Sequence, residues 1–294
     1  MKQKAIAVGS NPRVTLKPFL LEATGEGNTR PIVIVCPGGG FLGHSTVEGS
    51  PVARMLNRAG YHSAVLAYST QATAPGVDAY PQVLFDLADA ICMVRNRAEE
   101  WGVDSSRVVI LGFSAGGWLC AMYENLWASE LFLGHGSLEQ RRPDATVLCY
   151  PLVDYRNCGM IANEEIDLSA VLGLDAVRAD GFRAAMKRAL VGDRLLTDEL
   201  VSEVSPINHI GRATPPTFVW TSFGDGLLEP AQSLAYAQRL HEMGVPCELH
   251  VFNEGFHGIS LATEATAHRP VDKNDHVAHW AELMCEWLEL VFEA

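Results

Sequence analysis

The fold is decided by residues 108–117, which read Val108-Val109-Ile110-Leu111-Gly112-Phe113-Ser114-Ala115-Gly116-Gly117. Aliphatic residues run into a Gly-x-Ser-x-Gly pattern, and a helical pattern begins at Trp118. This order indicates a buried strand that turns sharply into a helix with Ser114 at the apex. Side chains two positions before and after the serine would collide with neighbouring strands, and Gly112 and Gly116 remove them. The pattern predicts a serine hydroxyl presented above a sheet, near the positive end of a helix.

Length and composition suit one large α/β domain. The chain has 294 residues, of which 48% are hydrophobic and 19% charged, so that a sizeable core is expected and disorder is not. The net charge is -13 and the pI about 5.2, which argues against nucleic acid or an anionic membrane as a partner because both need a basic surface.

Cysteine usage and the N-terminus favour a cytoplasmic protein. The basic N-terminal residues are followed by no apolar signal segment, and no run is apolar enough to span a membrane. The oligomeric state stays open, and a homo-oligomer is compatible with the sequence. The seven cysteines are scattered and odd in number, which indicates buried thiols rather than a disulfide framework: Cys36, Cys92, Cys120, Cys149, Cys158, Cys247 and Cys285.

Predicted strands and helices alternate along the whole chain. The strands are expected at 13–21, 32–36, 62–68, the run ending at Phe113, 145–149, 217–223 and 247–252. The helices are expected at 51–60, from Pro81 to Gly102, directly after Ser114, at about 230–243 and at about 275–292. This alternation predicts right-handed βαβ units and a mostly parallel central sheet flanked by helices.

Residues 154–214 interrupt this rhythm. A structureless loop of that length would be unusual, and a helical stretch is expected near 176–190, so we interpret the segment as a small helical insertion in a single domain covering 1–294. The insertion leaves the sheet at the carboxyl end of a strand, where ligands bind in α/β folds. A lid over the active site and a packing element away from it are both compatible with the sequence.

A nucleophilic serine needs a base, and the base needs an orienting carboxylate. In a strand-turn-helix context of this kind, the expected chain order is serine, then acid, then histidine. His257 follows the last predicted strand in a glycine-flanked loop, which makes it the best candidate base. His250 lies inside a predicted strand and His241 on a predicted helix, and His268, His276 and His279 lie on or before the last one. His62 opens a strand, and His44 follows the glycine loop and could touch substrate, but it precedes the serine in the chain.

Asp225 is the best-placed acid. It lies just beyond the 217–223 strand in Gly224-Asp225-Gly226, where the glycines permit a sharp turn. Asp154, which follows the preceding strand, is the rival, and Glu229 and Glu254 are weaker candidates.

An acyl-transfer site also needs amide donors for the oxyanion of its tetrahedral intermediate. The amide of Ala115, directly after the nucleophile, is one expected donor. The others are expected from Gly39 and Gly40, which follow the 32–36 strand and let the backbone approach a ligand closely. No metal-binding spacing and no phosphate-binding loop occur in the sequence, so that neither a metal nor a cofactor is expected.

Taken together, these pieces resemble the α/β-hydrolase superfamily, and within it the acetylesterase/lipase-like branch of acetyl-xylan-esterase-type carbohydrate esterases. The resemblance implies that Ser114 is the nucleophile, Asp225 the acid and His257 the base, and that short-chain esters, often acetyl groups on sugars, are the substrates. The segments that carry the resemblance are Pro37-Gly38-Gly39-Gly40-Phe41, Glu48-Gly49-Ser50-Pro51-Val52-Ala53, Tyr80-Pro81, 112–117, Pro215-Pro216-Thr217-Phe218, Pro230 with Ser233-Leu234, and Gly255-Phe256-His257-Gly258.

The sequence therefore predicts a serine esterase that works through an acyl-enzyme on Ser114 and acts on a small-molecule ester. Two alternatives stay open. A peptidase or amidase could use the same residues, since a triad alone does not separate esters from amides. A non-catalytic binding protein of the same fold is the other, although such proteins normally lose a triad member.

Overall fold

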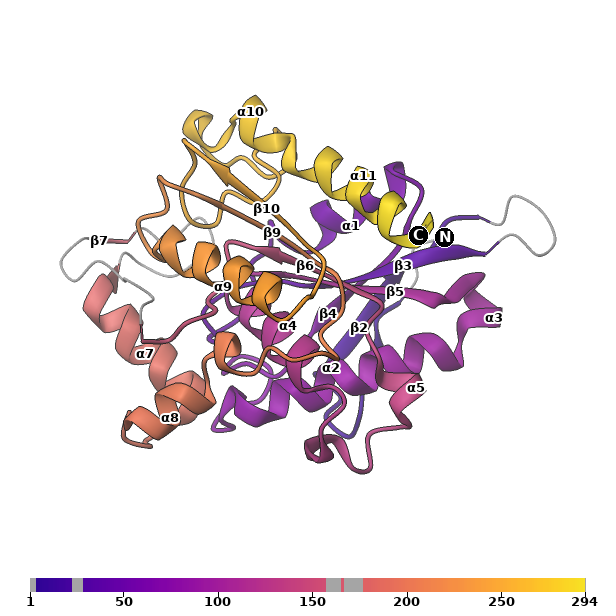
Figure 1. Ribbon diagram of the computed structural model, residues 1–294, viewed down its shortest axis with the longest axis horizontal. Coiled ribbons are helices and arrows are strands. Elements are labelled where there is room, and N and C mark those ends of the chain that lie inside the picture. The colour runs from indigo at the N-terminus through magenta and orange to yellow at the C-terminus, as the bar shows by residue number, and fades with distance from the viewer. Residues whose placement is uncertain (1–3, 23–28, 157–164, 167–176, 294) are drawn as a thin grey trace.

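An eight-stranded sheet forms the centre of the molecule, in the order β1-β2-β4-β3-β5-β6-β9-β10 (Figure 1). The computed structural model describes residues 4–22, 29–156, 165–166 and 177–293. The strands of the sheet are β1 Ile6–Ala7, β2 Thr15–Phe19, β3 Arg30–Cys36, β4 His62–Ala67, β5 Val103–Phe113, β6 Ala145–Cys149, β9 Thr217–Ser222 and β10 Cys247–Phe252. Near one edge, β2 runs antiparallel to both of its neighbours, β1 and β4, and the six strands from β4 to β10 pair parallel with one another.

Helices cover both faces of this sheet (Figure 1). The helices are α1 Ser50–Arg58, α2 Ala79–Asn96, α3 Ala98–Trp101, α4 Ala115–Leu126, α5 Leu138–Arg141, α7 Ala179–Val191, α8 Asp198–Glu203, α9 Pro230–Glu242, α10 Asp275–Ala278 and α11 Trp280–Glu293, with short 3-10 turns at Glu130–Phe132, Pro206–Asn208 and Pro270–Asp272. The α/β-hydrolase architecture predicted from the sequence, a mostly parallel sheet between helical layers, is therefore confirmed.

The two layers meet the sheet through alternating side chains. Along β3, Ile32 and Ile34 join the core formed with α2, α4 and α9, whereas Val33 and Val35 join the core formed with α1 and α11. Successive side chains of a strand point to opposite faces, so a central strand buried on both faces must be apolar throughout. The continuous apolar run of residues 32–36 follows from this requirement.

The predicted element boundaries differ from the structure mainly at helix ends. The long helix expected from Pro81 to Gly102 is two helices, α2 and α3, because Arg97 between them departs from helical geometry (φ -108°, ψ 11°). Gly102 ends α3 in the left-handed conformation (φ 64°), which glycine adopts without steric cost. The C-terminal helix is likewise divided into α10 and α11, with a break at His279.

The described residues between β6 and β9 include the helices α7 and α8 and a short antiparallel pair, β7 Glu165–Ile166 with β8 Val177–Arg178. The helical stretch expected near 176–190 corresponds to α7. The remainder of the predicted insertion, 157–164 and 167–176, lies outside the described residues. Its role as a lid stays a prediction.

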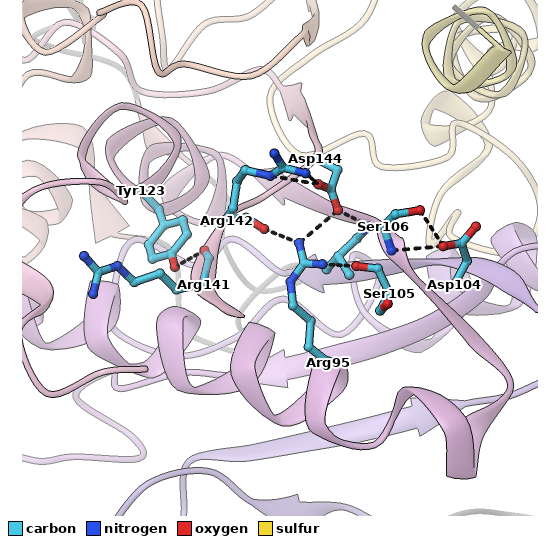
Figure 2. Close-up of polar contacts among 9 residues, drawn as sticks. Arg95, Asp104, Ser105, Ser106, Tyr123, Arg141, Arg142 and Asp144 are labelled. Carbon is cyan, nitrogen blue, oxygen red and sulfur yellow. Dashed lines mark hydrogen bonds and ion pairs between the residues drawn. The ribbon is translucent and has the colours of Figure 1, made fainter. Parts of the chain in front are cut away.

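A partly buried cluster of charged side chains lies at the amino-terminal end of β6, opposite the end where ligands bind in such folds (Figure 2). Asp144 accepts hydrogen bonds from Arg95 of α2 at 2.9 Å and from the Val108 amide of β5 at 2.8 Å, and it pairs with Arg142 at 2.9 Å. Arg95 also donates to the carbonyls of Ser105 and Arg142. These hydrogen bonds and ion pairs tie α2 to the sheet.

Two expectations from the sequence concern membrane-spanning segments and disulfides. Within the described ranges, no helix combines the length and apolarity that crossing a bilayer would need. The six cysteines that lie in the same ranges form no disulfide, and Cys36, Cys120 and Cys149 among them are buried.

Candidate active site

Ser114 stands at a strained turn between β5 and α4. Its φ of 51° is in the left-handed region that non-glycine residues rarely adopt. A Cβ at Gly116 would lie 2.0 Å from the Cys36 carbonyl oxygen, and a Cβ at Gly112 would lie 2.1 Å from the Gly116 oxygen. Only glycine fits at both positions, because strand and helix approach each other through bare backbone. The collision with a neighbouring strand that we inferred from the sequence occurs at Gly116, beside β3, whereas Gly112 is crowded by the backbone at the start of α4.

The structure brings Ser114, His257 and Asp225 together at the carboxyl ends of β5, β10 and β9. The Ser114 Oγ lies 2.8 Å from His257 Nε2, and His257 Nδ1 lies 2.8 Å from Asp225 Oδ2. The imidazole is 14% exposed and the carboxylate 1% exposed. A carboxylate can only accept, so Nδ1 donates to Asp225, which leaves Nε2 to accept the serine proton.

Asp225, rather than any of its rivals, is the carboxylate that contacts His257. Its second oxygen, Oδ1, accepts from the backbone amides of Leu227 at 2.9 Å and Leu228 at 2.8 Å. These two bonds fix the rotation of the carboxylate. Asp154 instead accepts from the backbone amide of Arg156 at 3.0 Å.

The glycine loop after β3 lies beside Ser114. Gly39 (φ 130°) and Gly40 (φ 61°) both have positive φ, which a side chain would disfavour. The Gly38 amide is already engaged, since it donates to Glu48 Oε2 at 2.8 Å. Ala115 opens α4, where amides point toward the helix N-terminus. Gly39, Gly40 and Ala115 therefore remain our candidate oxyanion donors.

His257 carries an upward-shifted pKa. Burial alone lowers it, but the charge and hydrogen bond of Asp225, together with the charge of Glu48, raise the pKa of His257 above its ordinary value of 6.5. The base must be neutral to accept the serine proton. Activity should therefore be present at high pH and disappear as pH falls through the raised pKa.

We accordingly expect the acid limb of kcat/KM to have its midpoint above pH 6.5, since this limb reports the free enzyme's base. The groups that face the imidazole are Asp225, Glu48, Ser114 and the ring of Tyr150, whose centroid is 5.1 Å away. A profile of kcat/KM from pH 5 to 9 on a short acyl ester measures the midpoint. A midpoint near pH 5 would contradict this electrostatic account.

Two buried residues beside the triad were not assigned any role from the sequence. Glu48 is 1% exposed and Tyr150 is 2% exposed, and the Tyr150 hydroxyl donates to Glu48 Oε1 at 2.7 Å. Glu48 belongs to one of the segments that carried the family resemblance. Its only local signal is a charge between Val47 and Gly49 in a segment that lacks other charges nearby.

No cluster of three or more potential metal ligands occurs among the residues that the structure describes. His44, singled out as a residue that could touch substrate, packs edge-on against Tyr68 with ring centroids 4.6 Å apart. Burial lowers the pKa of His44 to about 4, so this imidazole is neutral near pH 7.

A family model described as the α/β-hydrolase fold matches residues 33–261, well over half of the chain. The chain is a member of this family. The matched range includes all three residues of the hydrogen-bonded relay.

Solved structures of other α/β hydrolases resemble this one over nearly its whole length. The carboxylesterase Cest-2923 from Lactobacillus plantarum WCFS1 is 27% identical, with a TM-score of 0.79 over 98% of this chain and 96% of that one. An acetyl ester-xyloside bifunctional hydrolase from Caldicellulosiruptor lactoaceticus is 29% identical, with a TM-score of 0.72 over 95% and 88% of the two chains.

A longer relative matches through only part of its length. Endo-1,4-beta-xylanase B of Butyrivibrio fibrisolvens is 28% identical over 239 residues, which are 80% of this chain but 33% of that protein. The chain thus spans about a third of this relative, and the likeness concerns that portion alone.

Proposed function

We propose that this chain is a serine esterase that hydrolyses short-chain carboxylic esters through an acyl-enzyme on Ser114. The observation that carries the proposal is the unbroken relay from Asp225 through His257 to the Ser114 hydroxyl, with both bonds at 2.8 Å. Such a relay is what a weakly nucleophilic hydroxyl needs at neutral pH.

In the proposed reaction, Ser114 Oγ attacks the ester carbonyl carbon while His257 Nε2 takes its proton. The carbonyl oxygen becomes an oxyanion that the amides of Gly39, Gly40 and Ala115 bind. His257 returns the proton to the departing alcohol, which leaves an acyl-Ser114 ester. Water, deprotonated by the same imidazole, then releases the acid and restores Ser114. The charge of Asp225 favours the imidazolium that forms in both halves of the cycle.

We propose that the acyl group is small. The likeness to an acetyl ester-xyloside hydrolase favours acetyl groups, and sugars as the alcohol.

A panel of p-nitrophenyl esters from acetyl to octanoyl, run beside acetylated xylo-oligosaccharides, tests this assignment. We expect kcat/KM for the acetyl ester to exceed that for the octanoyl ester by about tenfold or more, because a pocket that rejects extra methylenes discriminates by that order. Faster cleavage of the octanoyl ester would contradict the short-chain assignment. Cleavage of p-nitroanilides at rates similar to those of the esters would favour an amidase instead.

A further inference from the structure

Glu48 is a buried carboxyl group whose two oxygens both accept hydrogen bonds. The Gly38 amide donates to Oε2 at 2.8 Å, and the Tyr150 hydroxyl donates to Oε1 at 2.7 Å. Within the described ranges, no lysine or arginine forms an ion pair with it. Burying a carboxyl without a cation is costly, so its place beside the relay calls for a reason other than stability.

Tyr150 connects Glu48 to the loop that bears His257. It follows β6 with a φ of 36°, a strained conformation for a residue with a side chain. Its hydroxyl accepts from the Ser260 amide at 3.1 Å, three residues beyond His257, and its ring packs against the imidazole with centroids 5.1 Å apart. The Ser260 hydroxyl in turn donates to the Val47 carbonyl at 2.9 Å, next to Glu48. The contacts thus close into a ring.

On its other side, Glu48 reaches the nucleophile through a single residue. A Cβ at Gly38 would lie 2.8 Å from Glu48 Oε2 and 2.9 Å from the Ser114 Cβ. Gly38 is therefore held between the carboxylate and the nucleophile. A displacement of Glu48 would pass directly to the glycine loop and to Ser114, because packed backbone cannot absorb it.

We propose that Glu48 and Tyr150 are positioning residues. The hydrogen bond between them, here called the bridge, holds the oxyanion glycines and His257 in the correct positions relative to Ser114. This inference rests on the proposed esterase function. Neither side chain needs to touch substrate. Their effect should appear in the chemical step, which depends on the placement of the amides and the imidazole to within about an ångström.

Glu48→Gln and Tyr150→Phe probe the two ends of the bridge. A glutamine oxygen can still accept from Gly38, but its amide faces a hydroxyl that then has no acceptor to donate to. Phenylalanine leaves Glu48 Oε1 and the Ser260 amide without their partner. On p-nitrophenyl acetate, we expect each variant to lose about 10- to 100-fold in kcat with KM changed less than about threefold. Labelling of Ser114 by a fluorophosphonate should slow by a similar factor.

The chain offers a matched control pair at the far end of α4. Glu124 is also fully buried, and it accepts from the Tyr236 hydroxyl at 2.5 Å and from the Thr217 hydroxyl at 2.8 Å. Glu124→Gln and Tyr236→Phe break the same kind of bond away from the relay. We expect them to lower Tm as much as the bridge variants do while kcat stays within about twofold of the wild type.

A double variant decides whether the bridge acts as one unit. If it does, Glu48→Gln with Tyr150→Phe should lose no more kcat than the worse single variant, since the second change removes a contact already broken. Multiplied losses, unchanged kcat in either single variant, or equal kcat losses in the control pair would each overturn the inference. A wild type that neither cleaves esters nor reacts with the fluorophosphonate would instead reject the proposed function.

Discussion

Ser114→Ala should remove nearly all esterase activity and leave the fold intact. Without Oγ no acyl-enzyme can form, and loss of a triad nucleophile costs about 10⁴- to 10⁶-fold in kcat. Alanine keeps the Cβ and therefore adds no new contact at the strained turn, where φ is 51°. Turnover of p-nitrophenyl acetate and Tm by calorimetry measure the two effects.

His250→Ala is a suitable control for Ser114→Ala, because it also removes a hydrogen-bonded side chain. His250 contacts Glu248 at 2.7 Å on β10, a histidine–carboxylate pair that has no serine in the relay. We expect its kcat to stay within about twofold of the wild type, because this half-buried pair does not contact Ser114, His257 or Asp225. If Ser114→Ala turns over esters at the wild-type rate, the nucleophile lies elsewhere and the proposed mechanism is wrong.

The sequence predicted those parts of the molecule that depend on short-range pattern. The apolar runs predicted the strands, and the glycines around Ser114 predicted the turn, because both reflect steric needs within a few residues. Ser114, Asp225 and His257 could be nominated since each directly follows a strand of a parallel sheet, and such ends converge at one edge.

Interactions between distant segments could not be predicted in the same way. Glu48 and Tyr150 are 102 positions apart, and no sequence pattern around either residue predicts that its polar group is buried. Their pairing depends on the register in which β6 lies beside the other strands. The break of the long helix at Arg97 was also not predicted, since the local pattern is helical on both sides.

Asp225→Asn should reduce kcat by about 10³- to 10⁴-fold without unfolding the protein, a loss of the size known for such triads. The reason lies in how the carboxylate is held. The amides of Leu227 and Leu228 both donate to Oδ1, so the asparagine oxygen should occupy that position, where it still accepts from both amides. The Nδ2 group then replaces Oδ2, 2.8 Å from His257 Nδ1. Because Nδ2 donates, Nδ1 must accept, and the imidazole proton moves to Nε2.

An imidazole protonated at Nε2 cannot accept the Ser114 proton, so the relay is blocked although every heavy atom stays in place. Asp225→Ala provides the comparison, because it leaves the tautomer free while it removes the carboxylate. We expect Asp225→Asn to be at least as inactive as Asp225→Ala, and NMR of the imidazole nitrogens to detect the proton on Nε2 in the asparagine variant. An asparagine variant with near wild-type kcat would mean that another carboxylate orients His257 and that Asp225 is not the acid of the relay.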